Sequence, residues 1–183
     1  MLRRRYLRVL LCFAAGVAAA ASAFAQREAT EAGVKAAFLY KFANYIEWPA
    51  NAFASPSAPL VIGVMGSEEI AAELERLVPG RNVNGHPVAV KRLKSGESAS
   101  GVHIVFVGRE QGGAAAAVHA AREQGALTVT ETERGLEATG SAINFVSGGE
   151  RVAFEVSLES AEKSGVRISS RMLAVAKRVV PRS

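Results

Sequence analysis

The sequence contains no aspartate, because all 17 of its acidic residues are glutamates. Aspartyl nucleophiles, Asp-rich calcium loops and Asp-based magnesium sites are therefore excluded. No G-x-S-x-G motif marks a nucleophilic serine, and the usual catalytic triads lack members, although a Ser-His-Glu arrangement stays open. The three histidines, His86, His103 and His119, stand at no recognised metal-ligand spacing. We expect a protein that is not an enzyme and that holds no metal or cofactor.

Cysteine is also nearly absent, and the single one lies in a segment with the layout of an export signal. Residues 1–8 carry four arginines and no acid, residues 9–21 are apolar, and Ala23-Phe24-Ala25 forms a small-x-small cleavage site. This order predicts a signal peptide over residues 1–25 and an exported domain over residues 26–183. Since Cys12 leaves with the signal, the exported chain holds its fold without a disulfide.

The excess of positive charge belongs to the same segment. Four of the 22 Lys and Arg residues lie in it, which leaves 18 bases against 17 acids in the exported chain. The sequence pI of about 9.7 is therefore set largely by the leader. A near-neutral exported domain lacks the basic footprint of a nucleic-acid-binding protein, so we expect no nucleic acid as a partner.

Apolar runs and helical periods alternate along the chain. Together they predict a single three-layer α/β domain, with a mostly parallel sheet of about six strands, an antiparallel hairpin, and helices on both faces. The hairpin turn is placed at residues 147–150. Predicted strands are residues 60–66, 86–93, 102–108, 127–131, 142–146 and 151–157, and predicted helices are residues 28–47, 67–78, 112–124, 158–164 and 168–179.

The segment FLYKFANYIEWPA, residues 38–50, holds five of the twelve aromatic residues. Tyr40 projects away from the apolar face of the predicted helix, and Trp48 stands at its end, before a proline. For these two, core packing and partner recognition both stay open, because Tyr and Trp are frequent in interface hot spots. The positions that share the apolar face are expected in the core: Phe38, Phe42, Tyr45 and Ile46.

Two further positions are candidates for binding. Gly66 and Ser67 form a strand-to-helix junction, for which a tight turn with a capped helix is the simple interpretation and a small anion at the helix start the alternative. The glycine pattern there is G-x-x-G, which is not a dinucleotide fingerprint. Arg171 follows Ser169-Ser170, the expected caps of the last helix, and suits a carboxylate on a partner.

Several segments, taken in order, resemble the YfiR family of periplasmic proteins, over nearly all of the exported chain, from about residue 34 to residue 177. These are KAAFLYKFANYIEWP, LVIGVMG, VHIVFVG, LTVTE, INFVSGGERVAFEVS and VRISSRMLAVAK. The chain departs from the family in lacking a cysteine outside the leader, whereas founding members carry disulfides. It also has Gly140-Ser141 in place of a Gly-Gly pair and Val156-Ser157 in place of Ile-Asn.

The resemblance implies a periplasmic regulator, which binds the sensor domain of an inner-membrane diguanylate cyclase and represses it. Repression would lower cyclic di-GMP and biofilm formation, an outer-membrane lipoprotein could sequester the repressor, and a homodimer is expected by analogy. Tyr40, Trp48 and Arg171 are the predicted partner-binding residues. The alternative is a small-molecule sensor coupled to a histidine kinase or another receptor, with Gly66 and Ser67 as ligand contacts.

Overall fold

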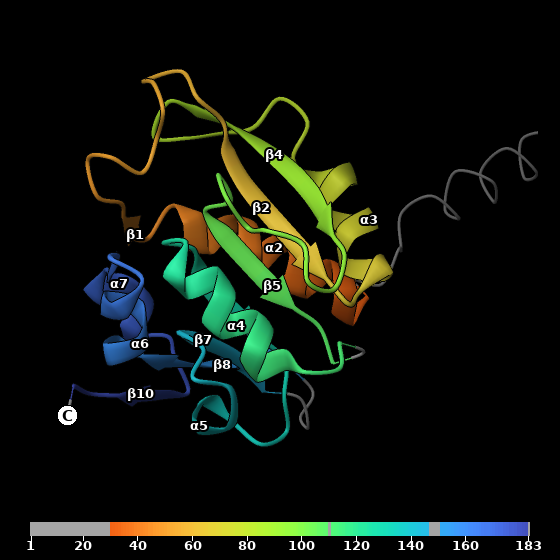
Figure 1. Ribbon diagram of the computed structural model, residues 1–183, viewed down its shortest axis with the longest axis vertical. Coiled ribbons are helices and arrows are strands. Elements are labelled where there is room, and N and C mark those ends of the chain that lie inside the picture. The colour runs from red at the N-terminus through yellow and green to blue at the C-terminus, as the bar shows by residue number, and fades with distance from the viewer. Residues whose placement is uncertain (1–29, 110, 147–150, 183) are drawn as a thin grey trace, which may run out of the picture. The chain divides into compact units, whose positions relative to one another are not determined.

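The computed structural model describes residues 30–109, 111–146 and 151–182 (Figure 1). The predicted signal peptide and the predicted hairpin turn at residues 147–150 lie outside these ranges. The part of the chain from residue 31 onward forms one compact unit. Among the described helices, none is long and apolar enough to cross a membrane.

An eight-stranded sheet runs through this unit in the order β10-β8-β7-β6-β5-β2-β4-β3. Its five central strands are parallel, whereas β8 runs antiparallel to β7 and β3 runs antiparallel to β4. The predicted, mostly parallel α/β sheet is confirmed, and the short edge strands β3 and β10 make it wider. The strands are β2 (Leu60–Met65), β3 (Asn82–Val83), β4 (His86–Leu93), β5 (Ile104–Val107), β6 (Leu127–Thr130), β7 (Ile143–Val146), β8 (Ala153–Ser157) and β10 (Arg178–Val180).

Helices cover both faces of the sheet, with α4 in front of it and α2 behind it in Figure 1. Side chains alternate along each strand, so Ile62 and Phe106 pack with α2 and α3, whereas Val105 and Val107 pack with α4. The apolar runs are thus explained by strands covered on both sides. The helices are α2 (Glu31–Ala43), α3 (Glu68–Leu77), α4 (Ala114–Glu123), α5 (Leu136–Thr139), α6 (Leu158–Lys163) and α7 (Ser170–Leu173).

Two predicted helices end differently in the structure. The first was expected to reach residue 47, but α2 ends at Ala43, and a turn leads into the short strand β1 (Ile46–Glu47). Tyr45 is consequently 39% exposed and does not belong to the core. The predicted helix over residues 168–179 is likewise wrong, because β9 (Arg167–Ile168), α7 and β10 divide that segment. In both places, the pairing of β1 with β9 overrides the local helical pattern.

Candidate functional site

A small antiparallel ribbon joins the aromatic segment, residues 38–50, to the C-terminal segment VRISSRMLAVAK. In it, Ile46 of β1 lies opposite Ile168 of β9, and Glu47 lies opposite Arg167. The ribbon continues for one more bond, since the Ser169 amide donates to the Tyr45 carbonyl at 2.9 Å. The aromatic segment and the C-terminal ISSRML segment therefore meet in space, with β1 beside α7 in Figure 1.

Trp48 comes directly after β1 and is half-buried. Its ring stands edge-on to Phe53 and His103, with centroid distances of 6.4 and 5.7 Å. The indole Nε1 is buried and has no hydrogen-bond partner within the described part of the chain. Trp48 is therefore held by contacts of its ring, while its only polar group has no acceptor among the described residues.

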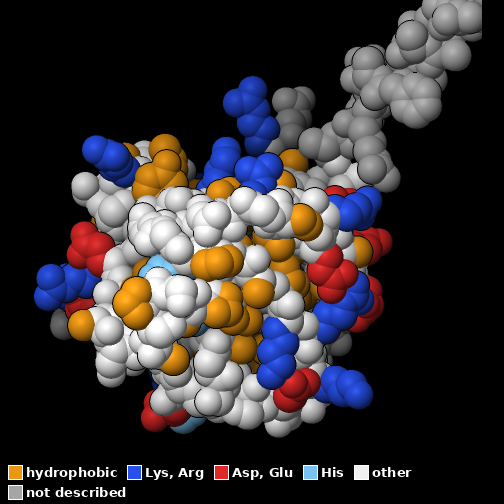
Figure 2. Space-filling view, turned by 90° about the horizontal axis from the view of Figure 1, so that it is seen from above, with side chains coloured by type: hydrophobic (Ala, Val, Ile, Leu, Met, Phe, Trp, Pro, Cys, Tyr) orange, Lys and Arg blue, Asp and Glu red, His pale blue; other side chains and the backbone are white. Residues whose placement is uncertain are grey.

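Figure 2 looks onto the end of the domain that carries loop 49–59, which follows Trp48. Hydrophobic side chains gather in the middle of this face, and charged side chains lie around them. Apolar groups ringed by charged ones are typical of a protein-binding surface. This end of the domain is thus a candidate interaction surface.

The other two predicted partner-binding residues lie on separate helices. Tyr40 is half-buried on α2, and the guanidinium of Arg81 lies 5.2 Å from its ring centroid. Arg171 is exposed on α7, next to the ribbon. The ribbon thus connects the segments of Trp48 and Arg171, whereas Tyr40 contacts a residue that follows α3. Their roles in binding stay predictions.

Gly66 and Ser67 form the expected tight turn with a capped helix. Gly66 has a φ of 69°, which favours glycine, and the Ser67 hydroxyl accepts a hydrogen bond from the Ile70 amide. The loop after β5 packs directly on this turn, because the Gly108 amide donates to the Met65 carbonyl at 2.8 Å. The tight turn is confirmed, and ligand binding by Gly66 and Ser67 stays a prediction.

A substitution at Gly108 tests how closely the loop after β5 packs on the turn at Gly66 and Ser67. A Cβ atom at residue 108 would lie 2.2 Å from the Gly66 carbonyl oxygen. Gly108→Ala is expected to lower the free energy of unfolding by about 1–3 kcal/mol, since backbone atoms would have to move. Gly112→Ala is the control, because a Cβ atom there meets nothing within 4 Å. Urea denaturation of both variants measures the difference, and equal stabilities would show that the loops separate easily.

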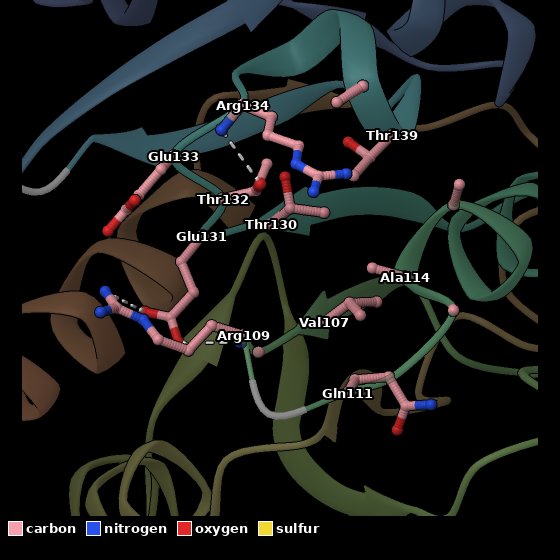
Figure 3. Close-up of a pocket in the computed structure, with 14 residues that line it drawn as sticks. Val107, Arg109, Gln111, Ala114, Thr130, Glu131, Thr132, Glu133, Arg134 and Thr139 are labelled. Atoms are coloured by element: carbon pink, nitrogen blue, oxygen red, sulfur yellow. Dashed lines mark hydrogen bonds and ion pairs between the residues drawn. The ribbon is translucent and has the colours of Figure 1, made fainter.

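A cavity of about 600 Å³ opens beside this contact, over the carboxyl ends of β5 and β6 (Figure 3). Ligands of open α/β sheets bind at this edge, next to the point where the strand order reverses. Here that point lies between β2 and β5. In the close-up, Arg134 points toward Thr139 on one wall, and Ala114 and Gln111 lie on the opposite wall. Arg134 was missed in the sequence because nothing local marks a loop arginine.

A buried ion pair lies next to this cavity, at the same carboxyl edge of the sheet. The Lys35 ammonium lies 2.5 Å from a carboxylate oxygen of Glu31 and 2.6 Å from one of Glu131. The Lys35 and Glu131 side chains are only 4% and 8% exposed. The other Glu131 oxygen accepts the Arg109 amide hydrogen bond at 3.2 Å. The spacing of Glu31 and Lys35 is a helical i,i+4 pair, but no sequence signal connects either with Glu131.

The described residues contain no group of three or more His, Cys, Asp or Glu side chains that could hold a metal ion. Comparison with known proteins adds a family assignment. The sequence model of the YfiR/HmsC-like family matches residues 32–177, from the start of α2 to the residue before β10. A search of curated proteins found no match.

Proposed function

Because the chain belongs to the YfiR/HmsC-like family, we propose that it is a periplasmic regulatory protein. It binds the periplasmic sensor domain of an inner-membrane signalling protein and holds that protein inactive. The partner is a diguanylate cyclase, so binding lowers cyclic di-GMP in the cytoplasm and restrains biofilm formation. An outer-membrane lipoprotein that sequesters the regulator, and a homodimer of the regulator, belong to the same proposal. No catalytic step is assigned to the chain.

The observation that carries this proposal is the outer side of the ribbon, named the ribbon face: Tyr45, Glu47, Arg167 and Arg171. Tyr45 and Glu47 point outward because Ile46 between them is buried, and Arg167 lies directly opposite Glu47. All four side chains are exposed. An exposed tyrosine with two arginines is the composition of an interface hot spot, since rigid rings and forked guanidinium groups bind at low entropic cost.

The direct test is capture of a partner by the chain of residues 26–183. Purified periplasmic domains of diguanylate cyclases and sensor kinases are mixed with it, and the Kd is then measured for the captured domain. Arg171→Glu is expected to raise this Kd at least ~10-fold, because it reverses an exposed charge at the interface without touching the core. Lys94→Glu, an exposed reversal on another loop, is expected to leave it unchanged.

Trp48→Ala complements this test, because it removes a hydrophobic side chain next to the ribbon face. Since its ring packs on Phe53 and His103, we expect this variant to lose binding together with local structure. Unchanged stability and an unchanged Kd for Trp48→Ala, with an unchanged Kd for Arg171→Glu, would place the interface elsewhere. Capture of no cyclase domain would contradict the assignment of the partner.

A second candidate function is a small-molecule sensor coupled to a histidine kinase or another receptor. The cavity at the carboxyl edge favours it, because its volume lies in the range of metabolite sites. In the described part of the chain, the Arg134 guanidinium lining this cavity makes no ion pair, and it suits a carboxylate or phosphate. Native mass spectrometry of the purified chain distinguishes the two functions, since a sensor retains a bound metabolite whereas a pure protein-binding repressor does not.

A further inference from the structure

Three aromatic rings from distant parts of the chain form a continuous stack at the end of the domain shown in Figure 2. Phe53, from loop 49–59, lies between His86 of β4 and His103, which precedes β5. The Phe53 and His86 centroids are 3.7 Å apart with planes at 9°, and the Phe53 and His103 centroids are 4.4 Å apart with planes at 21°. Trp48 stands perpendicular to His103. The stack therefore holds loop 49–59 and Trp48 against the sheet.

Hydrogen bonds determine where each imidazole carries its proton. The Val61 amide donates to His103 Nδ1 at 3.1 Å, so this nitrogen is unprotonated. The proton of His103 is then on Nε2, which donates to the Ala52 carbonyl at 3.1 Å. His86 Nδ1 lies 2.7 Å from the Ala58 carbonyl, which can only accept, so Nδ1 donates. The imidazoles of His86 and His103 thus bind loop 49–59 near both of its ends.

A second proton can add to His103 only at Nδ1, where it would face the Val61 amide hydrogen. Burial lowers the pKa of His103, and the charge of His86 lowers it further, against the opposing effect of the Ala52 carbonyl. The groups that face the ring are the Val61 amide, the Ala52 carbonyl, and the side chains of Phe53, Trp48 and His86. No carboxylate bonds to either imidazole within residues 30–109, 111–146 and 151–182. Among the described residues, no hydrogen-bonded carboxylate therefore compensates a positive charge on His103.

We propose that this stack is an acid-operated staple: when the surrounding pH falls, His103 binds a proton, the Val61 bond breaks, and loop 49–59 detaches together with Trp48. Because Trp48 follows β1 directly, detachment perturbs the ribbon and weakens binding at the ribbon face. That last step rests on the proposed function, whereas the release of the loop does not. The regulator would then release its partner in an acidic environment.

The direction of the pH effect follows from the lowered pKa. An imidazole in the unfolded chain titrates near ~6.5, and His103 titrates below this in the folded chain. The stability that neutral His103 contributes is therefore complete above ~6.5 and is lost as the pH falls through the lower, folded-state pKa. We expect the loop to be held at neutral pH and released once the pH falls well below ~6.5, through the lowered pKa of His103.

The test uses the chain of residues 26–183, in which Trp48 is the only tryptophan. Amide hydrogen exchange by NMR and Trp48 fluorescence are followed between about pH 7.5 and about pH 5. The Val61 protection factor is expected to fall at least ~10-fold over this range, while amides of β6 keep theirs. The Trp48 emission is expected to change with the same midpoint.

Three variants locate the response. His103→Gln keeps one donor and one acceptor but does not titrate, so its Val61 protection and Trp48 emission should not respond to acid. His86→Gln removes the neighbouring charge and should move the midpoint of the response to higher pH. His119→Gln, on the exposed side of α4, should respond as the wild type does.

A wild-type chain whose Val61 protection and Trp48 emission stay constant would overturn the staple. A His103→Gln variant that folds and still responds like the wild type would overturn it too. If His103→Gln does not fold, an unmoved midpoint in His86→Gln decides against it. With a captured partner, acid should raise the Kd for the wild type and not for His103→Gln, and equal losses would overturn the link to binding. Failure to capture a partner contradicts the proposed function and leaves the exchange result to decide the staple.

Discussion

Phe42→Ala is expected to lower the free energy of unfolding by about 3–5 kcal/mol, the range for removing a buried phenylalanine ring. Phe42 is 2% exposed and lies at the centre of an aromatic cluster behind the sheet. Its ring centroid is 4.9 Å from that of Phe154, 5.7 Å from that of Phe38 and 5.8 Å from that of Phe145. The variant loses these contacts and leaves a cavity that the strands cannot close.

Tyr45→Ala is the matched control for this experiment. Tyr45 lies three residues further along the same aromatic segment, and local sequence assigns it to the same face, but the structure exposes it. Its replacement should cost less than about 1 kcal/mol. Chemical denaturation of both variants, with the same probe and buffer, measures the difference. Equal costs would show that β1 does not turn Tyr45 away from the core.

Lys35→Met is expected to lower the free energy of unfolding by about 3 kcal/mol, because it leaves the buried Glu131 carboxylate without its closest cation. The Met side chain keeps the apolar stem of Lys35, so the loss reports the charge. Arg109 moderates the loss, since its guanidinium lies 3.8 Å from the same carboxylate oxygen. The double variant Lys35→Met with Glu131→Gln should recover part of the loss, because the uncompensated charge is then gone.

Lys163→Met is the control for the buried pair. Lys163 and Glu159 are also a helical i,i+4 pair at 2.5 Å, the same distance as between Lys35 and Glu31. The Lys163 side chain is 55% exposed, however, so its removal should cost less than about 0.5 kcal/mol. If Lys35→Met lowered the free energy of unfolding as little as Lys163→Met does, burial would not control the strength of these ion pairs. A double variant less stable than Lys35→Met would show that Glu131 is stabilised in another way.

Several features of the fold were predictable because their causes are local. The apolar runs at residues 60–66 and 102–108 became the central strands β2 and β5, as continuous runs do when helices cover both faces of a sheet. Ser67 caps α3 as its position before two glutamates suggested. His103 stands at the second position of the apolar run 102–108, so its imidazole is buried, and both ring nitrogens are hydrogen-bonded.

The ribbon of β1 and β9 and the residues beside it were only half predictable. Trp48 and Arg171 were selected for their residue types, but a strand of two residues has no period, so the ribbon of β1 and β9 is invisible in the sequence. The same reason explains why the prediction for Tyr45 was wrong: its helical spacing predicted burial. The turn after α2 rotates it outward, and its carbonyl pairs with Ser169 from the other end of the chain.

The sequence by itself determined the fold class and the family, because both depend on apolar runs, helical periods and the order of short segments along the chain. The export signal at residues 1–25 stays a prediction. It also determined what the protein lacks, above all aspartate and, outside residues 1–25, cysteine. Only the tertiary structure decided that Phe53 lies between two histidines, that Lys35 is buried with Glu131, and that Arg134 lines a cavity. These contacts join residues far apart in the chain, and their energies depend on burial, which only packing sets.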